Sequence, residues 1–360
     1  MGNYFKIFLI SFFLFLSIDW FFGNKIIDFL HKKEIILSEE KKIERNQKKR
    51  NEEKKYRIKN DFYHHSLKEN AQFLTTWGKN KYYTCTDGYG FRKYCSEKNN
   101  NEKDIILIGD SFTEGIGLGY YKTFAGMLSS KLNDRVYNMG VSSYSPIIYK
   151  NKIKYYVQNG LKIKHVIVFL DISDIDDATN YVECNNKVCS KQVQNINKTN
   201  ITQIKEKKLL PLLDLVKLFF KNIKRSIKPE VYIYRKDFVR SNWTFIEETE
   251  NIKLGIKNSI NHMNELYQFL KIKNISLSVA VYPHPGQILH DQVNSKQVII
   301  WNEFCKNKCK YFINYFPLFF EKLKDQDPKR LIKKYYIKND IHFNYEGNTL
   351  LFEKLKELNF

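Results

Sequence analysis

Short apolar runs alternate with longer amphipathic segments through most of this chain. Apolar runs of strand length lie at residues 105–109, 135–140, 165–171, 276–282 and 311–316. Segments with hydrophobic residues at helical spacing lie at residues 123–132, 145–159, 250–271 and 345–358. Strands that alternate with helices predict an α/β fold around a parallel sheet, and the continuous apolar run at 165–171 is typical of a strand buried on both faces.

A separate apolar segment lies near the N-terminus. From Tyr4 to Phe22 only Lys6 and Asp19 carry charge. A helix of this length, at about 1.5 Å per residue, is close to the roughly 30 Å of a bilayer core. A cleaved signal peptide is the alternative, but it needs small residues around a cleavage site, and residues 18–22 offer none. We therefore predict an uncleaved transmembrane anchor at residues 4–22.

The remainder of the chain divides by composition. Residues 25–60 are dense in Lys, Glu and Arg, which predicts a solvated helical stalk. Residues 61–103 form a turn-rich lead-in, and residues 104–360 carry the α/β pattern. Within that domain, residues from about 179 to 244 are polar and irregular, which predicts an insertion.

The charge balance is strongly basic. Lys and Arg number 60 against 39 Asp and Glu, a formal net charge of +21. Such an excess is compatible with a nucleic acid, an acidic polysaccharide or a membrane surface as partner. The sequence contains no basic-aromatic motif of a nucleic-acid-binding fold, so we expect no nucleic-acid partner and interpret much of the lysine as solvated surface. The oligomeric state is not predicted.

The six cysteines form three local couples, Cys85 with Cys95, Cys184 with Cys189 and Cys305 with Cys309. An even number in close couples favours disulfides, which form in oxidising compartments. Zinc binding and free buried thiols are the alternatives, but no couple has the C-x-x-C spacing of a zinc site. We therefore expect the body of the protein to be periplasmic or otherwise extracytoplasmic.

A candidate nucleophile follows the first apolar run. Ser111 stands directly after Gly109 and Asp110, and glycines follow at 115, 117 and 119. A strand-to-loop turn holds a serine rigidly, exposes it and places backbone N–H donors beside it, as acyl transfer requires. The alternative is that Ser111 only caps the next helix. The glycine spacing does not match a phosphate-binding loop.

Near the other end of the chain, Asp340 and His342 are two residues apart. In an extended loop both side chains project to the same side. An Asp in this position can hold one imidazole nitrogen and leave the other to accept a proton from a serine. The alternative is an ordinary polar loop before the last helix.

Together these motifs resemble those of the SGNH hydrolases, also called the GDSL-type esterase/lipase superfamily. Residues 109–115 (Gly-Asp-Ser-Phe-Thr-Glu-Gly) match the first block of that family, and residues 138–140 (Asn-Met-Gly) match the second. Residues 340–342 (Asp-Ile-His) are similar to the last block. The lead-in at 88–92 is similar to a segment found in membrane-anchored members of the family.

The resemblance implies a three-layer α/β/α fold with a flavodoxin-like sheet of about five strands. It implies Ser111 as the nucleophile, and His342 and Asp340 as its partners. The backbone N–H groups of Ser111 and Gly140 would form the oxyanion hole. No cofactor or metal is implied, and the substrate would be an acyl ester, with an O-acyl group on a cell-surface glycan as the expected case.

Two features depart from the family pattern. The last block is usually Asp-x-x-His, so Asp340 would act in an Asp-x-His variant. The third block usually supplies an Asn to the oxyanion hole, but no Asn follows the third strand directly, and Ser173 and Asn180 are the candidate substitutes. An ionised Asp cannot donate to an oxyanion, so the alternative is a hole with two backbone donors only.

Other polar residues near strand ends are candidates for contacts with substrate. We assign Asp110, Asn138 and His284 to this role, although His284 between two prolines is also interpretable as a turn residue. The acidic residues between 171 and 177 lack the glycine and terminal Glu of a calcium loop, so we predict no metal site there.

The sequence thus predicts a membrane-anchored serine esterase or O-acyltransferase. The alternative hypothesis is a catalytically inactive glycan-binding or assembly protein that retains the same scaffold.

Overall fold

The computed structural model describes residues 2–23, 55–96, 103–185, 187–190 and 238–360, together with the single positions 25, 26, 29 and 217. One compact unit comprises residues 55–191 and 233–360, and the N-terminal helix lies in a separate unit. The chain from 31 to 54 and most of the predicted insertion, from 191 to 237 except position 217, are outside the described residues.

The N-terminal unit contains helix α1 (Gly2–Ile18), which continues as a π-helical turn at Asp19–Gly23. Within the described residues, the 20-residue helical stretch Tyr4–Gly23 is the one with the length and composition to cross a membrane, with a mean hydropathy of 1.9 and 6% of its span buried. A signal sequence has the same properties, so the helix is either an anchor or a signal sequence.

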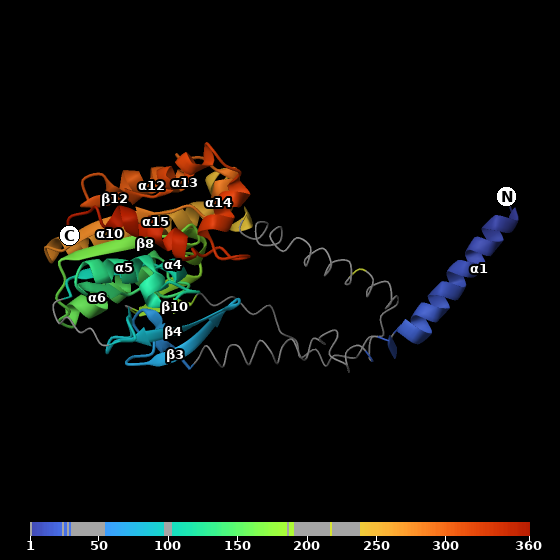
Figure 1. Cartoon of the computed structure of the whole chain (residues 1–360), viewed down its shortest axis with the longest axis horizontal. Helices are drawn as coiled ribbons and strands as arrows, with labels where there is room; N and C mark the ends of the chain where they lie inside the picture. Colours follow the sequence, from blue (N-terminus) through green and yellow to red (C-terminus); the bar gives the residue numbers. More distant parts are fainter. Residues whose placement is uncertain are drawn as a thin grey trace. The chain divides into compact units, whose positions relative to one another are not determined.

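The body is built on an eight-stranded sheet (Figure 1). Five strands are parallel, in the order β12 (Tyr311–Asn314), β11 (Ser276–Val281), β8 (His165–Leu170), β6 (Ile105–Ile108) and β7 (Val136–Asn138). Numbered along the chain, this order is 2-1-3-4-5 read from β7, the doubly wound arrangement of flavodoxin-like sheets. The predicted five-stranded parallel sheet is confirmed, and each strand lies within one or two residues of its expected position.

Three antiparallel strands extend the sheet beyond β7. They are β5 (Arg92–Lys93), β4 (Asn80–Thr86) and β3 (Gln72–Trp77). In Figure 1, β3 and β4 lie at the opposite side of the body from β12, as the strand order requires. These strands come from the predicted lead-in, so this segment is part of the main sheet.

Two further hairpins lie outside the main sheet: β1 (Arg57–Asn60) with β2 (His64–Leu67), and β9 (Tyr181–Cys184) with β10 (Lys187–Ser190). The prediction of a helical stalk as far as residue 60 is wrong for its last four residues, which form β1. Their pairing with β2 satisfies backbone groups that a solvated helix would satisfy internally.

Helices cover both faces of the sheet, which gives the predicted three layers. One core cluster joins the sheet to α6 (Pro146–Gln158), α10 (Glu250–Ile272) and α12 (Lys296–Cys305). The other joins it to α5 (Phe124–Lys131), α13 (Phe316–Leu323), α14 (Pro328–Tyr335) and α15 (Tyr345–Leu355). Alternate residues of β6 belong to alternate clusters, Ile106 and Ile108 to the first and Ile105 and Leu107 to the second, because successive side chains of a strand point to opposite faces.

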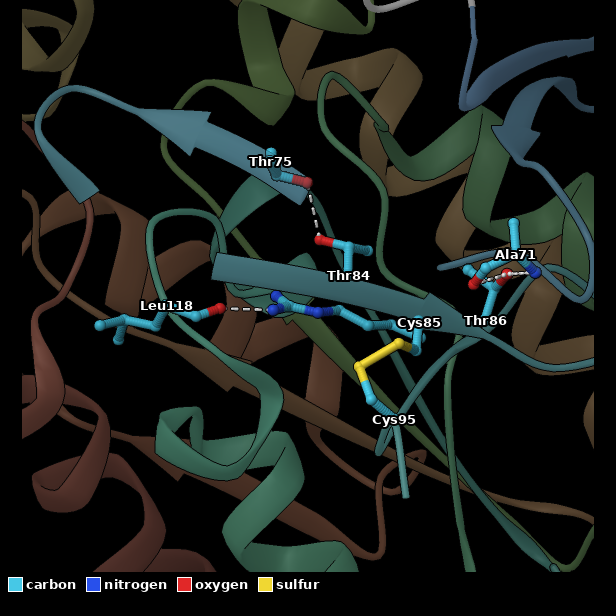
Figure 2. The surroundings of a disulfide bond; sticks show 8 residues. Ala71, Thr75, Thr84, Cys85, Thr86, Cys95 and Leu118 are labelled. Carbon is cyan, nitrogen blue, oxygen red and sulfur yellow. Dashed lines mark hydrogen bonds between the residues drawn. A yellow bond between two sulfur atoms is a disulfide. The ribbon is translucent and has the colours of Figure 1, made fainter. Parts of the chain in front are cut away.

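All three predicted disulfides are present. Cys85 is bonded to Cys95, Cys184 to Cys189 and Cys305 to Cys309, with Cα–Cα distances of 5.2, 6.0 and 4.8 Å. The first links the end of β4 to the segment after β5 (Figure 2). It therefore joins β4 covalently to the segment that follows β5, within the antiparallel extension.

Candidate active site

Ser111 lies where β6 ends and the short helix α4 (Ser111–Glu114) begins. A Cβ on Gly109 would come within 2.2 Å of Thr113 Oγ1 and 2.8 Å of the Phe169 carbonyl oxygen, so only glycine fits this sharp turn. The Asp110 carboxylate caps the helix by accepting from the Phe112 N–H at 2.9 Å. The chain runs from β6 to β7 on one side of it and then returns to β8 on the other side, and ligands bind in doubly wound folds at such a switch point.

The structure brings Ser111, His342 and Asp340 together as a hydrogen-bonded chain. Ser111 Oγ lies 2.8 Å from His342 Nε2, and His342 Nδ1 lies 2.5 Å from Asp340 Oδ1. The same carboxylate oxygen accepts from the backbone N–H of His342 at 2.9 Å. Ser111 is 9% exposed and His342 5%, so the network is mostly shielded from water. This is the geometry of a serine activated by a general base that a carboxylate orients.

The charge on Asp340 is stabilised locally. Burial opposes ionisation, but the hydrogen bond and charge of His342, with a further bond from Trp77, outweigh it and hold the pKa of Asp340 below its usual range. An ionised carboxylate at this place favours the tautomer in which His342 carries its proton on Nδ1 and Nε2 can accept from the serine.

Trp77, the last residue of β3, contacts both Asp340 and His342. The hydrogen-bonded set Ser111, His342 and Asp340 is called the triad from here on. Its indole Nε1–H donates to Asp340 Oδ2 at 2.9 Å, and its ring packs edge-on against His342 with centroids 5.4 Å apart. Phe112 packs on the same imidazole with centroids 4.8 Å apart. The imidazole is therefore held by two aromatic rings as well as by its hydrogen bonds.

Gly140, the expected oxyanion donor, follows β7 and packs on α4. A Cβ there would lie 2.7 Å from both Glu114 N and Thr113 Cβ. Its N–H donates to Asn138 Oδ1 at 3.0 Å, and Asn138 Nδ2 donates to the Thr113 carbonyl at 2.8 Å. Asn138 is 1% exposed, so its side chain fixes the loop against the helix and does not present the surface expected of a substrate contact.

Ser173 and Asn180 are the candidates to replace the Asn that the third family block usually supplies to the oxyanion hole, and their surroundings differ. Ser173, before helix α7 (Asp174–Asp177), donates its hydroxyl to Asp171 at 2.5 Å. Asn180 is exposed, and its amide lies 3.4 Å from Asp177 Oδ1. In the part of the chain that the structure describes, no hydrogen bond joins either of them to the triad.

A buried carboxylate cluster lies behind Ser111. His284, fully buried at the start of helix α11 (Pro285–His290), places Nε2 2.5 Å from Asp171 Oδ1. Burial opposes ionisation of Asp171, but the charge and hydrogen bond of His284 hold its pKa below the usual range. Burial and the charge of Asp171 raise the pKa of Asp110, whose carboxylate lies 3.1 Å from Ser111 Oγ. His284 and Asp110 are both buried. Neither side chain therefore offers the exposed surface that the expected contacts with substrate require.

One group of described residues has the spacing of a metal site, Glu183 with His262 and Glu265. The ammonium of Lys150 already lies among them, 2.5 Å from Glu265 Oε2 and 3.4 Å from His262 Nδ1, and it also bonds to Glu183. A lysine supplies the positive charge that a metal would bring, so these residues form an ion-pair cluster.

The loops around the site are fastened by two arginines. Arg92 of β5 donates to the carbonyls of Glu114, Gly115 and Leu118. Leu118 is labelled at the left of Figure 2. Arg57 of β1 pairs with the Glu114 carboxylate at 2.9 Å, which also accepts from the Ser142 N–H at 2.7 Å. The antiparallel strands thus position both the segment after Ser111 and the segment after Gly140.

No protein-family model and no curated protein matches the sequence. Solved structures that are similar to the chain include a member of the lipolytic protein G-D-S-L family from Veillonella parvula, at 10% identity over 71% of this chain and 97% of that one. They also include the psychrotrophic esterase EstA from a Pseudoalteromonas species (9% identity, 71% and 95% covered) and a catalytic mutant of an acetylxylan esterase from Geobacillus stearothermophilus (12% identity, 72% and 95% covered). Each has a TM-score of 0.38.

Sequence reasoning placed Ser111, Asp340 and His342 together but missed Trp77 and Arg92. A signal for Trp77 existed, since two runs rich in Thr and aromatic residues, at 73–77 and 82–86, flank Gly78 and Lys79, which is a sequence pattern typical of a β-hairpin.

Proposed function

We propose that the protein is a membrane-anchored serine esterase or O-acyltransferase of the SGNH type, acting on acyl esters, with an O-acylated cell-surface glycan as substrate. The observation that carries the proposal is the unbroken chain from Ser111 Oγ through the His342 imidazole to Asp340, with contacts of 2.8 and 2.5 Å. Chance pairing of polar residues does not explain a base that is oriented by a carboxylate and directed at a serine on a strand-edge turn.

The roles of the residues follow from these contacts. Ser111 Oγ attacks the ester carbonyl carbon while His342 Nε2 takes its proton. The C–O bond to the alcohol then breaks, the alcohol leaves with the proton from His342, and the acyl group stays on Ser111. Water or a sugar hydroxyl attacks the acyl-enzyme with His342 again as base, which restores the serine. Asp340 keeps the imidazole oriented and stabilises its positive charge.

Two backbone groups are assigned to the oxyanion. The N–H of Ser111 is at the first position of α4, where no intrahelical acceptor exists. The N–H of Gly140 would be shared between the oxyanion and Asn138, with which it is bonded at 3.0 Å. Loss of one hydrogen-bond donor from an oxyanion hole lowers the rate by about 10²–10³. Because the Asn of the third family block is missing, we expect the enzyme to be slow on unactivated esters.

The anchor and the disulfides support the proposed location. An apolar helix at Tyr4–Gly23 and three disulfides suit a body held on the oxidising side of a membrane. Acyl esters on cell-surface glycans are found on that side.

The test is hydrolysis of p-nitrophenyl acetate by the full-length protein in detergent. Ser111→Ala should abolish the activity, whereas Ser190→Ala, exposed at the end of β10, should leave it unchanged. Equal rates for wild type and Ser111→Ala would overturn the proposal.

The inactive glycan-binding or assembly protein remains the second candidate because Gly140 donates to Asn138 and no hydrogen bond between described residues links Asn180 or Ser173 to the triad. A serine-reactive fluorophosphonate separates the two. Labelling that disappears in Ser111→Ala supports the enzyme, and folded protein that resists labelling supports the second candidate.

A further inference from the structure

An open trough runs beside the β3–β4 hairpin. One cavity of about 700 Å³ is lined by the hairpin and by the loop after α4, and a second of about 840 Å³ continues from it along α5. The two share Tyr94, Ser96 and Tyr121, so together they form one extended depression, called the trough below.

The trough is linked to the proposed catalytic residues through Trp77. Trp77, which contacts both Asp340 and His342, is followed within three residues by Asn80, whose side chain donates to the Gly117 carbonyl at 3.1 Å. Asn80 and Gly117 both line the trough, and a Cβ on Gly117 would lie 3.6 Å from the Trp77 ring. The same hairpin therefore supports the triad and forms a wall of the trough.

The lining of the 700 Å³ cavity combines rings with positive charge. Five tyrosines and three lysines line it, with no Asp or Glu among its lining residues in the described chain: Tyr82, Tyr83, Tyr94, Tyr120, Tyr121, Lys79, Lys81 and Lys122. Tyr83 and Tyr121 are 54% and 62% exposed, so their rings are accessible. The one acid in the adjoining cavity, Asp134, is paired with Lys103 at 3.1 Å.

The wall of the trough is held by contacts within the protein. The Arg92 guanidinium lies 5.5 Å from the centre of the Tyr82 ring and 5.8 Å from that of Tyr120, and the Cys85–Cys95 disulfide closes the wall. Figure 2 shows this disulfide below β4, with Thr84 bonded to Thr75 on the neighbouring strand. A preformed, ring-lined depression binds a polymer with little loss of its own conformational entropy.

We propose that the trough binds a linear anionic polysaccharide and presents its acyl groups to Ser111. Tyrosine rings stack on the apolar faces of sugar rings, and lysines pair with carboxylates along the chain. Single-stranded nucleic acid also binds rings and lysines. A polysaccharide is favoured because the three disulfides indicate an oxidising compartment. The proposal rests on the proposed function only for the reacting acyl group, since binding itself does not need Ser111.

The test is affinity electrophoresis of the full-length protein in detergent, in gels that contain polygalacturonate or, as the neutral comparison, dextran. With a net charge of +21, the whole protein attracts polyanions. The control variant must therefore lose the same number of positive charges as the trough variant. The trough variant is Lys79→Gln with Lys81→Gln and Lys122→Gln. The control variant is Lys257→Gln with Lys271→Gln and Lys329→Gln, exposed lysines of α10 and α14.

The trough variant should bind polygalacturonate about tenfold more weakly at physiological salt, because three exposed ion pairs are lost, and the control variant within twofold of wild type. Tyr83→Ala should weaken binding and Tyr83→Phe should retain it. Ser111→Ala should bind like wild type, which separates this inference from the catalytic one. Equal weakening by both lysine variants, equal retardation by dextran, or tighter binding of oligothymidylate through the same residues would each overturn the proposal.

Discussion

The indole Nε1 of Trp77 lies 2.9 Å from Oδ2 of Asp340, although 263 residues separate the two in the sequence. His342 uses the other oxygen of that carboxylate, at 2.5 Å. Both oxygens of Asp340 are therefore fixed, one by His342 and one by Trp77 of the antiparallel extension. The orientation of the imidazole depends on a segment outside the α/β core.

Trp77→Phe keeps an aromatic ring but removes the N–H donor. A hydrogen bond to a charged group contributes about 1.5 kcal/mol or more, so kcat/KM on p-nitrophenyl acetate should fall about tenfold. Because the lost bond helps to keep the pKa of Asp340 low, that pKa should rise. An unchanged kcat/KM would show that Trp77 acts only by packing.

Asp340→Asn replaces the carboxylate by an amide of the same shape. The amide cannot stabilise an imidazolium, and it favours the wrong tautomer when its NH₂ faces Nδ1, so kcat should fall about 10³-fold with KM little changed. Asp325→Asn, an exposed acid between α13 and α14, is the matched control. A loss below tenfold would remove Asp340 from the mechanism.

Gly140→Ala should displace the segment after β7 from α4, because the new Cβ would meet Thr113 Cβ and Glu114 N at 2.7 Å. We expect about a 10²-fold loss in kcat through the oxyanion donor. Gly160→Ala is the comparison, since Gly160 has open space around it but a φ of +93°. It should lower the melting temperature through backbone strain and leave kcat per folded molecule unchanged.

Lys152, buried in α6, donates to the Met139 carbonyl at 3.1 Å and to Tyr144 at 3.0 Å. Burial lowers its pKa to about 7, against 10.5 for the free side chain. Between these values the unfolded chain binds the proton and the folded chain does not, so this group makes the free energy of unfolding increase with pH.

Urea unfolding of wild type and Lys152→Met at pH 7 and pH 9 measures this effect. At about 1.4 kcal/mol per pH unit, the stability of wild type relative to the variant should increase by about 2 kcal/mol. A difference between the two proteins that stays constant with pH would show that Lys152 remains charged in the folded state.

The parallel strands were predictable because their signal is local. The residues of β8 are all buried, so its sequence reads as one apolar run, and the helices beside it show regular amphipathic spacing. Ser111 could be placed because a Gly-Asp turn follows an apolar run, and His342 because Asp340 stands two residues before it. The hydrogen bond of Trp77 could not be predicted, since it depends on how the edge strand β3 meets a loop near the other end of the chain.

The burial of His284 could also not be predicted from the sequence. A histidine between two prolines after a strand is equally compatible with an exposed turn and with a buried ion pair. The deciding partner, Asp171, lies 113 residues away and belongs to a different strand end. The stalk prediction failed at Arg57–Asn60 because a charged segment suits a helix locally, whereas tertiary pairing with β2 selects a strand.

The antiparallel extension also decides where the protein can be truncated. A recombinant fragment that starts at residue 104 would keep all five parallel strands together with Ser111, Asp340 and His342. It would nevertheless lose Arg92, leaving the carbonyls of Glu114 and Gly115 without their cation, and it would turn β7 into a bare sheet edge open to aggregation. The smallest fragment expected to fold with a working site therefore starts near residue 55, where the compact unit begins.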